Sequence, residues 1–289
     1  MKIIETHIVP AVSEKIRLQE YAVSIFTSIR TRSGIKKAIK KGLILINDRK
    51  AHTADWIKEG QKIDLLKQEV SAKKVFELKL EILFEDEDLA VVHKPPGYPT
   101  SGNYFKTIQN ALPYNLKAST APDALSLPLP AHRLDNPTSG ILLCAKSRKA
   151  LIGLQQDFKE RRINKVYYAL VNGEIPEPVE INSSIEDKTA STKVTPKEKF
   201  EIENKKYTLA EANPLTGRTH QIRIHLAKNG NPIVGDVEYG EEELGLFKGK
   251  TLYLFAVSIS FQHPVTKESM HFEMSLPKKL RSLKRYRLP

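Results

Sequence analysis

The 289-residue chain has 40% hydrophobic and 7% aromatic residues, which excludes a largely disordered protein. No apolar run approaches the roughly 20 residues of a membrane-spanning helix, and we see no secretion signal at the N-terminus. The net charge of +12 is concentrated at the two ends: residues 1–80 carry +8, the last thirteen residues +6 and the remainder −2. This distribution favours a polyanionic partner, nucleic acid ahead of an anionic membrane surface.

The single cysteine, Cys144, cannot form an internal disulfide, which suits a reducing cytoplasm. It lies in the apolar run ILLCAK, so we expect a buried, unreactive thiol. We therefore predict a cytoplasmic protein, and a monomer by default, since the sequence carries no signal for oligomerisation.

The N-terminal elements begin with a helix predicted within residues 13–30, where apolar residues recur at helical spacing. A second helix is predicted over 33–42, with Ser33 as its N-cap and Gly42 as its stop. The sequence then predicts a strand, a turn and another strand, at 43–47, 47–50 and 62–66.

Basic residues gather around the second helix. They are Arg30, Arg32, Lys36, Lys37, Lys40 and Lys41. On an isolated helix such residues form a solvated face, but a cluster in one short unit is what phosphate contacts need. Residues 1–68, with a core at about 13–68, resemble the S4 RNA-binding module: two helices, the second basic, then a strand and an IND turn where the module usually has VNG. The resemblance implies a small α/β RNA-binding domain.

The rest of the chain divides into three parts. Residues 69–80 are polar with few turn residues and predict a linker. Residues 81–276 contain many short apolar runs and a helix at 148–162, which indicates an α+β domain with a mixed, mainly antiparallel sheet. Residues 277–289 form a basic C-terminal tail, which we expect to be a disordered arm that contacts RNA rather than a merely solubilising end.

Residues that could carry chemistry occur in four stretches of the large domain. These are EDEDLAVVHKPPG at 85–97, AHRLDNPTSG at 131–140, NKVYYALVNG at 164–173 and PLTGRTHQIRIHLAKNGNPIVGDVEYG at 214–240. Singly, each has a structural interpretation: Asp135 fits a tight turn, and His220 and His225 fit structural histidines. Neither these histidines nor His132 and His263 show a zinc-ligand spacing, so we expect no metal site.

Together and in this order, the four stretches resemble the RluA-type family of RNA pseudouridine synthases. The resemblance spans about residues 80–276, and HRLD..TSGILL and TGRTHQIRIHL....PI.GD..YG are its most specific parts. An S4-like module before such a domain is the arrangement of members that act on large-subunit ribosomal RNA. The resemblance implies an isomerase of RNA uridines, with ribosomal RNA as the expected substrate and transfer RNA as the alternative.

The resemblance also implies roles for individual residues. Asp135 is the catalytic aspartate, and Tyr167 packs against the uracil that is flipped out of the RNA. Arg223 is expected to pair with the aspartate's carboxylate, with Arg218 as a second candidate, and Arg133 lies at the opening left in the RNA. Independently of the family, an arginine keeps a carboxylate charged in a dry pocket. An aromatic face recovers about 1–3 kcal/mol of the unstacking energy.

The sequence leaves several alternatives open. Asp135 could attack C1′ of the ribose, add to the uracil ring or remove a proton from the sugar. Another class of protein is a non-catalytic RNA-binding or ribosome-assembly protein, against which the intact set of predicted site residues argues. A hydrolase using Asp135 with His132 is disfavoured, because no second carboxylate or metal set is evident. The isomerisation transfers neither electrons nor phosphate, so we expect no cofactor.

Overall fold

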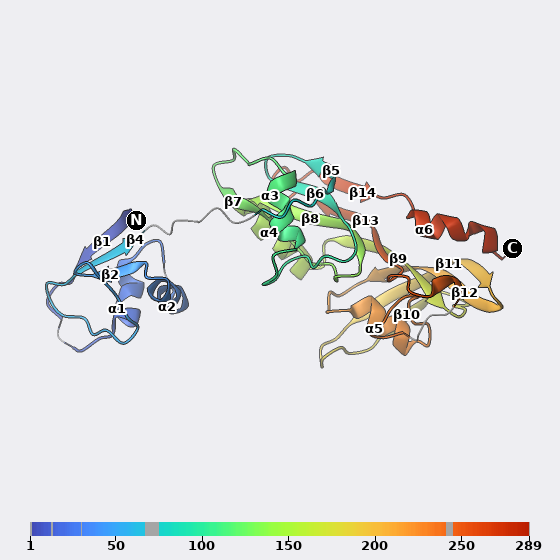
Figure 1. Ribbon diagram of the computed structural model, residues 1–289, viewed down its shortest axis with the longest axis horizontal. Helices are drawn as coiled ribbons and strands as arrows, with labels where there is room; N and C mark the ends of the chain where they lie inside the picture. Colours follow the sequence, from blue (N-terminus) through green and yellow to red (C-terminus); the bar gives the residue numbers. More distant parts are fainter. Residues whose placement is uncertain (1, 13, 30, 67–74, 241–244, 289) are drawn as a thin grey trace. The chain divides into compact units, whose positions relative to one another are not determined.

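The computed structural model describes residues 2–12, 14–29, 31–66, 75–240 and 245–288, and the chain divides into two compact units, 1–73 and 74–289. The first unit combines two helices with a four-stranded antiparallel sheet in the order β1-β4-β2-β3 (Figure 1). Its elements are β1 (Ile3–Ile8), α1 (Leu18–Ile25), α2 (Arg32–Lys40), β2 (Ile44–Ile46), β3 (Arg49–Lys50) and β4 (Lys62–Leu66).

Most elements of the first unit were predicted. The second helix, the strands β2 and β4, and a turn with Asn47 and Asp48 at positive φ are confirmed. The first helix is shorter than predicted, because only α1 is helical. The predicted cap of α2 is wrong: the hydroxyl of Thr31, not that of Ser33, accepts a hydrogen bond from the backbone N–H of Gly34 at 3.1 Å. Strand β1 was missed because no residue in it is fully buried, so it lacks a marked apolar alternation.

The basic face of α2 points to solvent, opposite an apolar stripe that packs in the core of this unit. The exposed lysines here are Lys36, Lys37 and Lys40 on α2 and Lys41 directly after it. Arg32 is also exposed and forms an ion pair with Glu20 at 2.6 Å. Arg30 lies outside the described residues.

The second unit is built on a ten-stranded mixed sheet, in the order β10-β11-β12-β9-β13-β8-β6-β5, with β14 beside β13 and β7 beside β8. The β13–β8 pair is parallel, and the other pairings within the described residues are antiparallel. The α+β class and the mainly antiparallel sheet are thus confirmed.

The strands of the second unit are β5 (Glu81–Glu85), β6 (Leu89–Lys94), β7 (Ala124–Pro130), β8 (Ser139–Ser147), β9 (Asn164–Asn172), β10 (Val179–Asn182), β11 (Ser191–Ile202), β12 (Lys205–Pro214), β13 (Leu254–Gln262) and β14 (Ser269–Glu273). Its helices are α3 (Ile108–Asn115), α4 (Arg148–Lys159), α5 (Gln221–Lys228) and α6 (Lys278–Arg281), with 3-10 turns at Gly245–Phe247 and Ser282–Tyr286. None of the helices in the described parts of the chain is long and apolar enough to cross a membrane.

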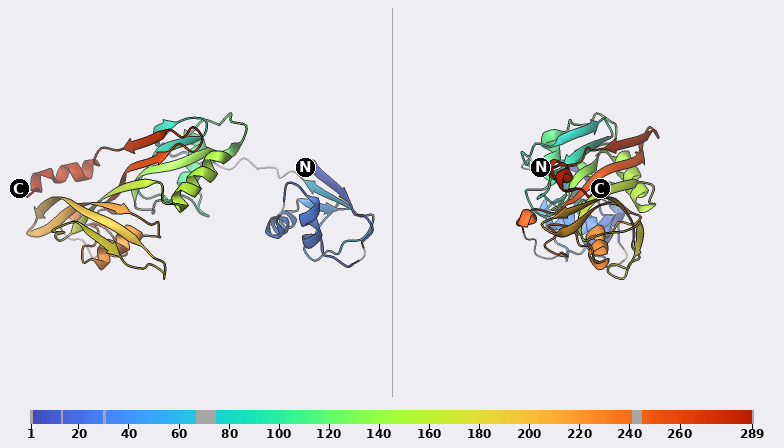
Figure 2. Two further views of the ribbon diagram at one scale, coloured as in Figure 1. Left: turned by 180° about the vertical axis from the view of Figure 1, so that it is seen from behind. Right: turned by 90° about the vertical axis from the view of Figure 1, so that its right-hand side faces the viewer.

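Strands β6 and β8 are covered on both faces. Alternate residues of the two strands pack with α3 on one face, and the intervening residues pack with α4 on the other. Figure 1 shows α3 in front of the sheet, and the left panel of Figure 2 shows α4 on the opposite face. Cys144 on β8 is fully buried, which confirms the prediction of a buried thiol, and burial raises the pKa of that thiol.

The predicted linker does not extend over the whole of residues 69–80. Residues 67–74 lie outside the described residues, and residues 75–80 belong to the second unit. Leu80 is buried beside α3, and the backbone N–H of Phe76 donates to the carbonyl oxygen of Asn110 at 3.0 Å. The alternating apolar residues Phe76, Leu78 and Leu80 give this segment a face that the domain core can bury.

The basic C-terminal tail is folded, so the prediction of a disordered arm is wrong. Leu280 and Leu283 insert into the hydrophobic core of the second unit, and the backbone N–H of Leu288 donates to the carbonyl oxygen of Lys199 at 2.9 Å. Leucines three positions apart lie on one side of a helical turn, where they can be buried together while the basic side chains stay outside.

Gly140, at the start of β8, is required by the close approach of two strands. It has φ of +131°, and a Cβ there would lie 2.1 Å from the carbonyl oxygen of Ala256 on β13. Gly140→Ala is expected to destabilise the fold by about 3 kcal/mol or more, since a backbone clash adds to an unfavourable φ. Gly217 has open space around it, so Gly217→Ala should change stability by less than about 1 kcal/mol. Denaturant unfolding of both variants tests this, and equal stabilities would contradict it.

Candidate active site

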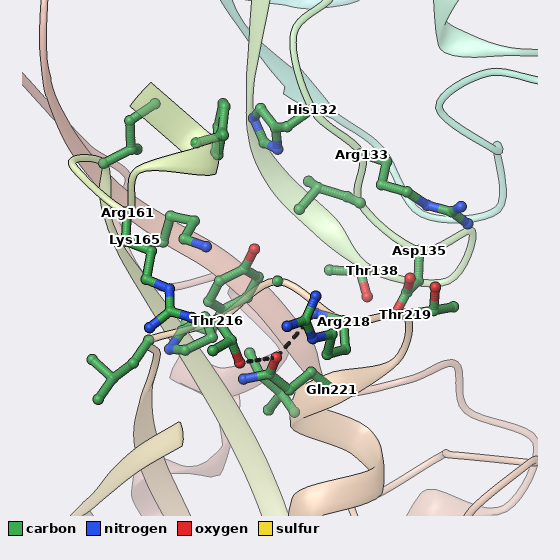
Figure 3. A pocket seen from close by; sticks show the side chains of 18 of the residues that line it. His132, Arg133, Asp135, Thr138, Arg161, Lys165, Thr216, Arg218, Thr219 and Gln221 are labelled. Carbon is green, nitrogen blue, oxygen red and sulfur yellow. Dashed lines mark hydrogen bonds between the residues drawn. The ribbon is translucent and has the colours of Figure 1, made fainter. Parts of the chain in front are cut away.

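A cavity of about 790 Å³ opens in the second unit. It lies where three segments meet: the loop between β7 and β8, the connection from α4 to β9, and the connection from β12 to α5 (Figure 3). Asp135, Arg133, Tyr167 and Arg218 line it, and Arg223 does not. Its size is within the range of small-molecule pockets, so it can take a nucleotide with its base turned out.

The turn that carries Asp135 is held on its N-terminal side by a buried hydroxyl. The carbonyl oxygen of Asp135 accepts a hydrogen bond from the N–H of Thr138 at 3.1 Å, as the turn prediction requires. The Thr100 hydroxyl donates to the carbonyl oxygen of Leu134 at 2.9 Å and accepts from the Leu134 N–H at 3.1 Å. Both backbone groups of the residue before Asp135 are therefore fixed.

Lys94 holds the C-terminal side of the same turn. Its side chain is fully buried at the end of β6, and its ammonium donates to three carbonyl oxygens, those of Pro95 at 3.1 Å, Asn136 at 3.0 Å and Thr138 at 2.7 Å. Burial lowers the pKa of Lys94 to about 8, and the negative charge of Asp135 acts in the opposite direction. Sequence reasoning missed this role because the three acceptors are backbone groups, two of which lie more than 40 residues away.

His220 approaches Asp135 from the start of α5. Its Nε2 lies 3.8 Å from Oδ1 of Asp135, and its Nδ1 lies 3.0 Å from the hydroxyl of Tyr239 and 3.3 Å from Oε1 of Glu238. His220 has φ of +53°, a left-handed conformation that is uncommon outside glycine and recurs at functional sites. It was expected to be structural but lies in the cavity wall. His225 does have a structural setting, since it is buried and hydrogen-bonded on both ring nitrogens.

The predicted ion pair between Arg223 and Asp135 is wrong. Within the described part of the chain, Nε and a terminal nitrogen of Arg223 donate to the two carboxylate oxygens of Asp236, each at 2.7 Å, and the same terminal nitrogen donates to Glu238 at 3.1 Å. Burial acts to lower the pKa of Arg223, but the hydrogen bonds and charge of Asp236 outweigh it and raise that pKa, with a smaller contribution from Asp135. The buried carboxylate of Asp236 accepts two hydrogen bonds from the guanidinium of Arg223, which makes it a better partner than Asp135.

The remaining predicted residues lie around the cavity in different settings. Burial raises the pKa of the Tyr167 phenol, and the negative charge of Asp135 adds to this, so the phenol stays neutral. Arg133 is exposed on the same side of the cavity as Asp135 (Figure 3). Arg218 donates through Nε to the carbonyl oxygen of Thr189 at 3.1 Å and makes no ion pair with Asp135 among the described residues.

The fold and the cavity define a class of protein. A family model described as RNA pseudouridylate synthase matches residues 88–228, which include β6, the Asp135 turn, β9 and α5. A solved structure, human RNA pseudouridylate synthase domain containing 1, superposes with a TM-score of 0.57 and 28% identity, covering 73% of this chain and 89% of that one.

Two relatives extend the match over almost the whole chain. An uncharacterized RNA pseudouridine synthase of Aquifex aeolicus is 32% identical over 98% of this chain and 97% of its own length. Ribosomal large subunit pseudouridine synthase C of Vibrio parahaemolyticus is 34% identical over 86% of each chain. The chain belongs to the RNA pseudouridine synthase family, as its RluA-type motifs predicted, and it is an RNA pseudouridine synthase, an isomerase that acts on RNA.

Proposed function

We propose that the protein converts uridine to pseudouridine in large-subunit ribosomal RNA, with Asp135 as its catalytic carboxylate. The observation that carries the aspartate assignment is the turn itself: Asp135 is held between the Thr100 and Lys94 contacts and lines the same cavity as Tyr167. The ribosomal substrate is supported by relatives such as the synthase C of Vibrio parahaemolyticus, whose name states that substrate.

The reaction breaks the N1–C1′ bond of uridine, turns the uracil and joins C5 to C1′. The hydrogen on C5 leaves as a proton and N1 gains one, so atoms and charge balance without a co-reactant. The Asp135 carboxylate supplies negative charge beside the ribose and the base. It attacks C1′, adds to the ring or removes a sugar proton, and all three routes need a carboxylate held at a fixed position.

Other cavity residues act on the flipped nucleotide. Tyr167 offers a neutral aromatic face against which the uracil packs. Arg133, exposed beside Asp135, occupies the space that the base leaves in the RNA. Arg218 contacts the substrate from the connection between β12 and α5. Arg223 acts indirectly: its fork with Asp236 fixes the start of α5, and with it His220 next to Asp135.

The N-terminal unit supplies affinity for RNA. Its two helices and its IND turn support an S4-like module, and the lysines of α2 form a solvent-exposed basic face. Lys36, Lys37, Lys40 and Lys41, with Arg30 and Arg32, contact phosphates in this proposal, a binding mode that tolerates any base sequence. The protein acts in the cytoplasm as a monomer, without a metal ion or cofactor.

The test uses RNA tritiated at uracil C5, because that carbon must lose its hydrogen to become the glycosidic atom. Purified protein is expected to release tritium to water from large-subunit ribosomal RNA and not from transfer RNA. The RNA chain should stay intact and no free uracil should form, which separates isomerisation from hydrolysis. Release from transfer RNA alone would contradict the ribosomal substrate, and release from neither would contradict the proposal as a whole.

A further inference from the structure

Strand β9 forms a second wall of the cavity, apart from the turn that carries Asp135. Lys165 and Tyr167 both line the cavity, whereas their neighbours Val166 and Tyr168 do not. Residues two positions apart on a strand share one face and lie roughly 6.5 Å apart. One nucleotide, from its base to its backbone phosphate, can bridge such a distance.

Lys165 is a half-buried cation that lacks an acidic partner. Its Nζ lies 5.9 Å from the centre of the Phe158 ring. Within the described residues, no carboxylate lies at ion-pair distance from it, and its positive charge adds to burial in lowering the pKa of the nearby His132 to about 3. Burial also lowers the pKa of Lys165 itself. A partly desolvated ammonium without a counter-charge is unfavourable, and a bound anion would relieve this.

The acidic residues nearby are already engaged. Asp157 and Glu160 both pair with Arg162, whose Nε donates to Oδ1 of Asp157 at 2.8 Å. Arg161 also lines the cavity, and its side chain makes no hydrogen bond or ion pair in the described part of the chain. Figure 3 shows Arg161 and Lys165 on the side of the cavity opposite Arg133 and Asp135.

We propose that Lys165, with Arg161 outside it, binds a backbone phosphate of the nucleotide whose base packs on Tyr167. This inference rests on the proposed RNA-binding role of the cavity and deepens it by assigning a phosphodiester subsite. Lysine offers a point charge to a phosphate oxygen, and the arginine adds directed donors at the rim. Such a contact holds any flipped nucleotide whatever its neighbours, while Asp135 faces the sugar and base from the other side.

The test measures binding of the full chain to a fluorescent single-stranded oligouridylate at several salt concentrations. Each phosphate contact to a single strand contributes roughly 0.7 to the slope of log affinity against log salt. Lys165→Met is expected to weaken binding about tenfold and to reduce the slope by one such contact. Lys165→Arg should keep both values. Lys149→Met removes an exposed lysine of α4 outside the cavity and should leave both nearly unchanged.

Thermal unfolding of each variant separates lost contacts from misfolding, and Lys165→Gln provides a second neutral variant. The inference is overturned if Lys165→Met and Lys165→Gln bind with the affinity and slope of Lys149→Met. Inorganic phosphate, at constant ionic strength, is expected to displace the oligouridylate more readily from wild type than from Lys165→Met, and equal displacement from both would also overturn the inference. The oligouridylate measurement does not depend on turnover, so a failure to release tritium from ribosomal RNA would be seen separately.

Discussion

Asp135→Asn is expected to slow tritium release from uracil C5 by about four orders of magnitude or more, the usual effect of removing a reacting group. Asparagine has nearly the shape of aspartate, and the turn is held by Thr100 and Lys94 rather than by the carboxylate itself. The variant should therefore keep its fold, and its Kd for the same RNA should change by less than about threefold. Single-turnover release and a binding titration measure the two quantities.

A matched control is Asp187→Asn, which removes the same charge from an exposed loop outside the cavity. We expect this variant to release tritium at the wild-type rate. A normal rate for Asp135→Asn would show that another group carries the reaction. His220, whose Nε2 lies 3.8 Å from Oδ1 of Asp135, would then be the first residue to substitute.

The fold was largely predictable because its strongest signals are local. Runs such as GILLCAK are continuously apolar, and β8 is indeed buried along its whole length. Elements whose burial depends on distant partners were harder to predict. Residues 75–80 and 277–288 read as a polar linker and a charged tail, because each contributes only a few apolar residues to a core supplied by other segments.

The cavity lining was predicted in part, since motifs identify residue types but not their partners. Asp135, Tyr167, Arg133 and Arg218 do line one cavity. The partner of Arg223 was wrong because Asp236, thirteen residues away, is brought under the guanidinium only when the chain turns after α5. His220 was likewise recognisable only from its backbone conformation and its distance to Asp135, neither of which the sequence displays.

Lys94→Met is expected to lower kcat about 100-fold while leaving the Kd for RNA nearly unchanged. The substitution leaves the carbonyl oxygens of Pro95, Asn136 and Thr138 without their donor. Hydrogen bonds from a charged group contribute roughly 1.5–3 kcal/mol each, and three carbonyl oxygens lose their donor, so the variant is also expected to lose several kcal/mol of stability. The loss of kcat comes from the position of Asp135, since a shift of about 1 Å in a reacting group can slow a reaction about 100-fold.

Lys94 also predicts how activity depends on pH. Its pKa is about 8 in the folded protein against an ordinary 10.5, so between these values the unfolded chain binds more protons and this group makes stability rise with pH. Activity should instead fall as the pH rises, because the neutral amine of Lys94 has only two hydrogens to donate to three carbonyl oxygens. The kcat of the wild type is expected to fall as pH rises through about 8, and Lys94→Met should lack this decline.

Lys146→Met is the matched control for Lys94→Met. Lys146 is also buried, at the far end of β8, where it pairs with Glu85 at 2.7 Å, outside the cavity. Removing it leaves a carboxylate unpaired and should lower stability, yet kcat at neutral pH should stay within about threefold of wild type, because the Asp135 turn is untouched. If Lys94→Met kept the wild-type kcat, or if Lys146→Met lost kcat equally, Lys94 would have no specific part in positioning Asp135. A fall in kcat confined to Lys94→Met, with both variants folded at the assay temperature, would establish that a buried ammonium sets the position of the reacting carboxylate.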